Sequence, residues 1–174
     1  MFTKETIDQY FNAFKNEQIF LMVLGAIALT VAIVFFVGLK TKWYKGFALP
    51  LAVFGMINLG AGVSNYKKAD FLKVRNTYNY DLHHELLRTK ELPRVKEMNQ
   101  NYTILIYVNI SIIFAAAFIF FYFKRKDGNE YYMGVAASLF LVAVLSVAIY
   151  TVMKSRSKNY ERGIIEYTKV IIIK

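Results

Sequence analysis

Residues 103–123 read TILIYVNISIIFAAAFIFFYF, an apolar run that contains no acidic or basic side chain. A helix needs about 20 such residues to cross roughly 30 Å of hydrocarbon. Three further runs of this kind occur at residues 19–39, 46–64 and 131–153. Because each run is apolar on every face, a soluble bundle of this size could not bury all four. The sequence therefore predicts an all-α membrane protein with four transmembrane helices.

The composition fits apolar blocks that are separated by charged segments. Hydrophobic residues make up 56% of the 174 residues, yet 22 Lys and Arg stand against 12 Asp and Glu, giving a net charge of +10. The chain contains no cysteine. This absence excludes disulfide bonds and membrane enzymes that use a thiol.

The positive charges predict the orientation in the membrane. The N-terminal, central and C-terminal segments carry 16 Lys and Arg residues, against 6 in the two short loops. Since positive residues stay on the cytoplasmic side, both termini and the centre are expected in the cytoplasm. Basic residues beside spans also attract anionic lipid, at about 1 kcal/mol each, so an anionic bilayer is an expected partner. They are not interleaved with a stacking platform, which argues against nucleic acid.

The two halves of the chain share an architecture. The tripeptide TKE at residues 3–5 recurs at residues 89–91, and the same offset carries the first span onto the third and the second onto the fourth. We therefore expect two tandem hairpins, residues 1–88 and 89–174, with cytoplasmic helical extensions, together forming one membrane domain.

Two local features refine this expectation. Pro93 is well placed in a first helical turn and poorly placed inside a helix, so it predicts a break and restart near Leu92. The N-terminal lead-in predicts a short amphipathic helix that rests in the membrane interface. Its apolar residues at helical spacing are Phe2, Ile7, Tyr10, Phe11 and Phe14.

Ionisable residues with catalytic spacing are lacking. His83 and His84 are adjacent, so on a helix they point about 100° apart and do not readily bind one metal ion. No metal-binding or catalytic motif accompanies them. We expect no catalytic residue, metal or cofactor. The plain interpretation is a pair of solvated histidines on a cytoplasmic helix, and the sharper alternative is pH sensing, because histidine titrates near neutrality.

Inside the spans the polar side chains are few and uncharged, which argues against proton-coupled transport. Asn58, Asn109, Ser111 and Ser138 are candidates for hydrogen bonds across helices or for the lining of a pore between copies. Small residues at helical spacing predict close helix packing. They are Gly25, Ala28, Ala32, Ala48, Ala52, Gly55 and Gly134.

Two stretches carry a resemblance. ELPRVKEMNQNY at residues 91–102, with GAGVSNYKK at residues 60–68, resembles small four-span inner-membrane proteins of uncharacterised function from Gram-negative bacteria. The resemblance covers the second to third spans, and it departs where those proteins carry further acids before the third span. It implies a multi-pass protein of the bacterial inner membrane and transfers no catalytic residue.

Two functions from different classes remain open. The first is a non-enzymatic membrane protein that acts through contact with itself or another protein, as an immunity protein that neutralises a toxin or a regulatory subunit does. The second is a homo-oligomeric ion channel or pore, for instance in a defence system. A lipid-modifying enzyme ranks third, because the acids and histidines that such enzymes need are scattered here.

Overall fold

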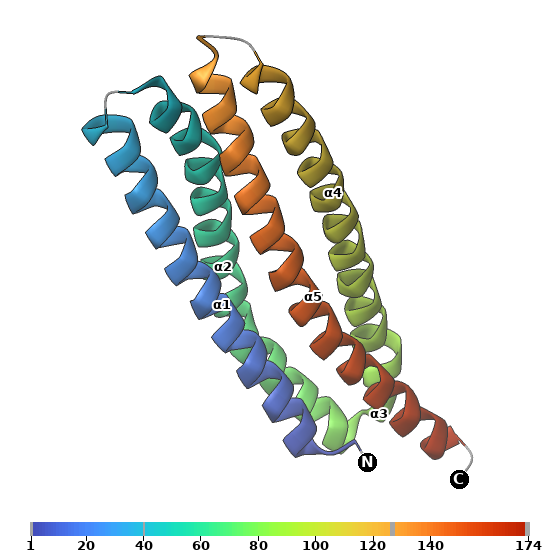
Figure 1. Ribbon diagram of the computed structural model, residues 1–174. Coiled ribbons are helices and arrows are strands. Elements are labelled where there is room, and N and C mark those ends of the chain that lie inside the picture. Colours follow the sequence, from blue (N-terminus) through green and yellow to red (C-terminus); the bar gives the residue numbers. More distant parts are fainter. Residues whose placement is uncertain (1, 40, 126–127, 173–174) are drawn as a thin grey trace.

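The computed structural model describes residues 2–39, 41–125 and 128–172, with side chains described as far as Lys169. All of its regular elements are helical (Figure 1). In chain order they are α1 (Lys4–Ile33), η1 (Val34–Gly38), α2 (Lys42–Leu82), α3 (His84–Leu86), η2 (Leu87–Glu91), α4 (Leu92–Lys124) and α5 (Glu130–Ile172), where η marks a π-helical turn.

Four helical stretches are long and apolar enough to cross a membrane, which confirms the all-α prediction and the four candidate spans. They are Lys4–Gly38, Lys42–Leu82, His84–Lys124 and Glu130–Lys169. The second has 41 residues. At 1.5 Å per residue it extends about 60 Å, twice the thickness of the hydrocarbon. Each stretch can therefore span a membrane and continue well beyond it.

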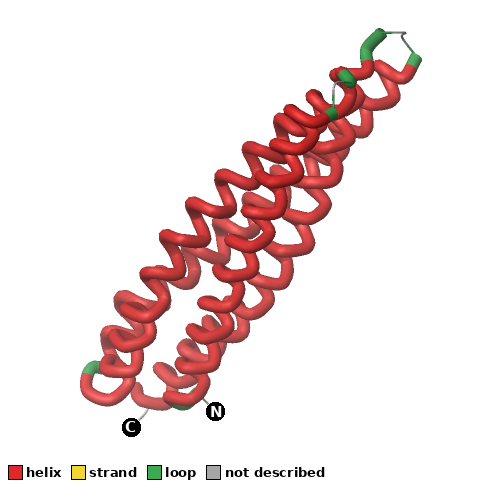
Figure 2. The backbone as a smooth tube through the Cα atoms, turned by 90° about the vertical axis from the view of Figure 1, so that its left-hand side faces the viewer, coloured by secondary structure: helices red, strands yellow, loops and turns green. Residues whose placement is uncertain are grey.

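The long helices divide the molecule into two parts. The apolar half contains residues 19–39, 46–64, 103–123 and 131–153, and it ends in the two short loops. The terminal half contains residues 2–18, 65–102 and 154–169, and most of the charged side chains. Both chain ends lie at the far end of the terminal half (Figures 1 and 2).

The helices stand in a row rather than in a closed square. α1 packs along α2, α2 along α5, and α5 along α4, whereas α1 touches α5 only briefly. Figure 1 shows the resulting order α1, α2, α5, α4 across the molecule. Within the described chain, α1 and α4 do not pack along each other. α4 is therefore an edge of the row.

The lead-in and the first span form one continuous helix. Thr3 caps α1, because its hydroxyl accepts a hydrogen bond from the Thr6 backbone N–H at 3.3 Å and the Thr6 hydroxyl accepts one from the Thr3 N–H at 3.3 Å. The predicted helix in the membrane interface is wrong. Its apolar side chains are buried or half-buried inside the protein instead, packed against other helices of the terminal half.

The central break lies earlier than predicted. α2 ends at Leu82, and the next residue, His83, leaves the helical region with a φ of −140° and a ψ of 62°. From His84 onward the chain is helical through Pro93. Proline lacks an N–H and its ring clashes with the carbonyl four residues earlier, and a wider π turn relieves both problems. η2 stands directly before Pro93 and its neighbour Leu92, so the chain continues where a restart was expected.

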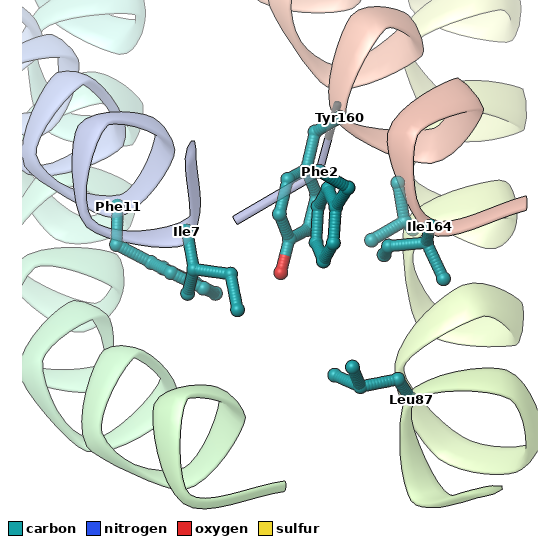
Figure 3. Close-up of a cluster of buried hydrophobic side chains, with 7 residues drawn as sticks. Phe2, Ile7, Phe11, Leu87, Tyr160 and Ile164 are labelled. Carbon is teal, nitrogen blue, oxygen red and sulfur yellow. The ribbon is translucent and has the colours of Figure 1, made fainter. Parts of the chain in front are cut away.

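The terminal half has a core of large side chains from the N-terminal segment, η2, α4 and α5, and Leu72 and Tyr80 of α2 pack against it. Figure 3 shows Phe2, Ile7 and Phe11 from the N-terminal segment beside Tyr160 and Ile164 of α5. The complete cluster is Phe2, Ile7, Phe11, Leu87, Val95, Tyr160 and Ile164. It draws on both predicted segments, 1–88 and 89–174, so these segments share a core.

Small residues fill the interior of the apolar half. A Cβ atom added to Gly25 would lie 2.8 Å from the Gly55 carbonyl oxygen, so the backbones of α1 and α2 nearly touch. The buried cluster beside this contact consists of Ala28, Ala32, Ala48, Leu51 and Phe54, with Ala52 partly buried next to it. Close backbone approach of this kind is how helices associate in lipid.

α2 and α5 approach each other even more closely near the loops. A Cβ atom on Gly134 would overlap the Trp43 carbonyl oxygen, and one on Gly46 would overlap that of Tyr131. Gly134 was among the predicted packing residues, whereas Gly46 was not. The two glycines together join α1 and α2 to α4 and α5 in the apolar half.

Gly46→Ala should destabilise the protein by about 1–3 kcal/mol, because the new methyl group meets backbone atoms that cannot move aside. Thermal unfolding in detergent measures the effect. Gly60→Ala on the same helix is the matched control, since no atom lies within 4 Å of its added Cβ. Alanine also favours a helix, so the control should be neutral or slightly stabilised. Equal losses in both variants would contradict the close α2–α5 contact.

Candidate functional site

The predicted polar residues of the spans are not gathered at one place. Asn58 on α2 and Ser138 on α5 are buried, whereas Asn109 is half-buried and Ser111 exposed on α4. Asn58 and Asn109 each donate to the backbone carbonyl four residues earlier, at 2.8 Å, and Ser111 does so at 3.1 Å. These three hydrogen bonds stay within one helix rather than crossing between helices. The Ser138 hydroxyl has no partner among the described residues.

The two histidines lie at the central break and point to different neighbours. His83 is exposed, and its ring centroid is 5.7 Å from that of Tyr78. His84 Nδ1 lies 2.9 Å from the Tyr167 hydroxyl, so it connects α3 to α5. Within residues 2–39, 41–125 and 128–172, no three side chains of metal-binding type are grouped. The pH-sensing role of the histidines stays a prediction.

A buried ion cluster at the start of α4 was missed by the sequence analysis. The side chain of Glu91, the last residue of η2, has no exposed surface. Arg94 donates to both of its oxygens, at 2.9 Å from Nε and 2.5 Å from a terminal nitrogen. Arg75 on α2 donates to the same carboxylate at 3.4 Å. Glu91 therefore ties α2 to α4 through two guanidinium groups, one of them bidentate.

Aromatic rings cover this cluster. The Arg94 guanidinium lies 5.9 Å from the centre of the Phe11 ring of α1, and that of Arg75 lies 5.7 Å from the Phe71 ring. Burial alone would lower the pKa of Arg94. The hydrogen bonds and charge of Glu91 outweigh that effect and raise the pKa, so the pair stays ionised.

Two tyrosines stack between α1 and α5. The Tyr10 and Tyr160 rings have centroids 3.9 Å apart and are inclined by only 1°. Burial raises the pKa of Tyr10 to about 12, and it raises that of Tyr160 even further above its usual range. Both phenols are therefore neutral throughout the physiological range.

Uncharged polar groups complete the interior of the terminal half. Asn99 on α4 donates to the Glu161 carboxylate of α5 at 2.6 Å. The Asn76 side chain is fully buried, and neither its amide nitrogen nor its oxygen has a partner among the described residues. Buried polar groups normally form hydrogen bonds. Asn99 does so and thereby favours one arrangement of α4 and α5, whereas Asn76 has no such bond within the described residues.

The chemistry of the terminal half is that of a packed core. Its buried carboxylate is held by two arginines, its tyrosines are neutral, and large apolar side chains surround both. A sequence signal for the cluster exists in the Glu91–Arg94 spacing of three, which pairs side chains on one helix face. Charged residues in a lead-in are normally solvated, which is why the pair was not recognised as buried.

In comparisons with known proteins, no family model, curated protein or solved structure matches the chain. The resemblance to small four-span proteins of Gram-negative bacteria stays a prediction.

Replacing Glu91 with alanine should leave two partly buried arginines unpaired. Because those side chains remain 28% and 37% exposed, we expect a loss of about 2–3 kcal/mol, below the range for a fully buried pair. Asp70→Ala, which breaks an exposed pair with Lys15, should cost less than about 1 kcal/mol. Thermal unfolding of both variants in detergent tests this, and equal effects would show that Glu91 behaves as a surface charge.

Tyr10 should make the protein sensitive to alkali. Below pH 10 both the folded and the unfolded chain keep its phenolic proton, so it adds no pH dependence. Above pH 10 the unfolded chain loses the proton first, and stability falls by roughly 2–3 kcal/mol up to about pH 12. Unfolding measured from pH 9 to 12 should show a shallower decline in Tyr10→Phe. Tyr78→Phe, at an exposed position, is the control and should follow the parent protein.

Proposed function

We propose that this protein is a non-enzymatic integral membrane protein that acts through contact with itself or another protein, and that the outward side of α4 makes the contact. One observation carries the proposal. α4 stands at the edge of the row and packs along α5, which leaves its opposite side without a protein neighbour through the whole apolar half.

The outward side of α4 has the spacing of a helix-packing surface. Its residues alternate at intervals of three and four, which keeps them on one face and suits a left-handed crossing with another helix. We call this set the outer stripe of α4. It consists of Ile104, Tyr107, Ser111, Phe114, Phe118 and Phe121. All are exposed, the phenylalanines by 64–73%.

Two members of the stripe favour a protein neighbour over lipid. The Tyr107 side chain is 67% exposed, and its hydroxyl has no hydrogen-bond partner in the described part of the chain. A polar group without a partner is costly in hydrocarbon, and a facing helix can satisfy it. Ser111 is small and lies between the aromatic residues, so a second helix can approach closely there.

The proposal includes an orientation. The chain forms two tandem hairpins, its terminal half lies in the cytoplasm, and the membrane is a bacterial inner membrane. The excess of Lys and Arg in the terminal half supports the orientation, and the resemblance supports the membrane. A protein that neutralises a toxin or regulates a membrane complex would act in this way.

A homo-oligomeric channel is the alternative, and the partial exposure of Asn109 and Ser111 on α4 favours it. Two constraints limit this alternative. The residues are two positions apart, about 200° around the helix, so they cannot line one path together. The cluster around Phe2 and Tyr160 fills the interior of the terminal half (Figure 3), so a path would have to run between copies of the chain.

Cross-linking in membranes tests the contact through the stripe. The natural chain has no cysteine, so a single Ser111→Cys reports its own neighbours without background. We expect mild oxidation to give a disulfide-linked dimer. Ile27→Cys on α1, which is 56% exposed, is the matched control and should give at least about tenfold less dimer. Similar yields from both positions would indicate random collision and contradict the proposed surface.

Conductance across a planar bilayer separates the two functions. If the protein acts through contact alone, we expect no ionic current across the bilayer. Currents that disappear in Ser111→Leu or Asn109→Leu, while Thr30→Leu on α1 conducts normally, would replace it with the channel.

A further inference from the structure

A groove between α2 and α4 crosses the border between the two halves of the molecule. Its cavity has a volume of about 590 Å³ in the terminal half. Asn65, Lys68 and Phe71 line it from α2, and Arg94, Asn101 and Tyr102 line it from α4. The groove exists because these two helices do not pack along each other, although both pack on α5.

The groove continues along α2 into the apolar half. A second hollow of about 870 Å³ shares Lys68 and Phe71 with the first, and it reaches Leu59, Gly60 and Val63. No atom lies within 4 Å of a Cβ atom added to Gly60, so this part of the wall is open. The combined surface is polar and basic at one end and apolar at the other.

The basic end contains cations that no carboxylate neutralises. Among the described residues, Lys67 and Lys68 are exposed and form no ion pair. The next cations on α2 are paired, Lys73 with Asp8 and Arg75 with Glu91. Glu97 also lines the cavity, but Lys67 and Lys68 are unpaired and Arg75 and Arg94 share the single charge of Glu91, so the local charge is positive.

The position of these two lysines fits a lipid headgroup. They follow directly after the second apolar run, where the hydrocarbon is expected to end and the phosphates of a bilayer to begin. A basic pocket between membrane helices at this depth is a recognised form of site for anionic lipid. A soluble phosphate compound would leave the apolar wall at Leu59, Gly60 and Val63 without a partner.

We propose that the groove binds one anionic glycerophospholipid of the surrounding bilayer. Its phosphate lies at Lys67 and Lys68, and an acyl chain follows the open wall of α2 past Gly60. Asn101 and Tyr102 of α4 border the region of the glycerol backbone. This site goes beyond the proposed contact function, and it stands whether or not the outer stripe of α4 binds a partner.

Native mass spectrometry of the purified protein tests the site. The protein is titrated with phosphatidylglycerol and, separately, with phosphatidylcholine. We expect one phosphatidylglycerol molecule to bind to each protein chain, more tightly than phosphatidylcholine does. Lys67→Gln/Lys68→Gln should weaken its binding about thirtyfold, which corresponds to about 2 kcal/mol. Lys154→Gln/Lys158→Gln on α5 removes the same charge near the same border and should stay within about twofold of the parent.

A second variant tests the apolar wall without changing any charge. Gly60→Phe fills the open space beside the wall and should weaken phosphatidylglycerol binding by at least about tenfold. Its thermal stability without lipid should match that of the parent, which separates blocking from misfolding. Glycerol 3-phosphate, which carries the phosphate without chains, should not displace the lipid.

Four results would overturn the lipid site. Equal losses in the two lysine double variants would indicate a general surface charge, and equal binding of both lipids would exclude headgroup recognition. Displacement by glycerol 3-phosphate would assign the cations to a soluble ligand. An Asn101→Cys chain that forms a disulfide dimer and retains no lipid would place a second copy in the groove.

Discussion

No hydrophobic force draws two apolar helices together inside hydrocarbon, because lipid tails are as apolar as the helices themselves. The four helices must therefore associate through close backbone contact or through contacts made outside the hydrocarbon. The protein uses both means. Gly25 meets Gly55, and Gly46 and Gly134 let α2 and α5 touch. Beyond the apolar half, where water provides a hydrophobic force, large aromatic side chains take over.

The interior thus changes character along the same helices. Alanine and glycine dominate where lipid surrounds the molecule, and phenylalanine, tyrosine and a buried Glu91 dominate in the terminal half. Small residues permit the open row, because each helix needs only a narrow strip of contact with the next. The large side chains reach further, so Phe11 of α1 can contact Arg94 of α4 although the two helices do not pack along each other. The terminal half fixes the relative positions of α1 and α4, which do not pack along each other.

The four candidate spans could be predicted from the sequence, because the length and hydrophobicity of a segment alone identify such a span. The environment of the lead-in could not, since Phe2, Ile7 and Phe11 have the same helical spacing whether lipid or protein covers them. Pro93 indicated a break that a π turn avoids, and His83, which carries no breaker signal, supplies the break instead. Glu91 was missed for a related reason. A charge is expected in water unless tertiary structure brings two arginines to it, and one of these comes from a distant part of α2.

The contact of Phe2 with Tyr160 and Tyr167 has a consequence for biosynthesis. A ribosome releases α1 long before it has made the last third of α5, so Phe2 first meets only Tyr80 of α2 and lacks its α5 partners while the intervening helices are made. The core closes only when α5 emerges. A chain whose translation stops before α5 would leave Phe2 without its contacts to Tyr160 and Tyr167, so the packing of the earliest residues depends on a helix made much later.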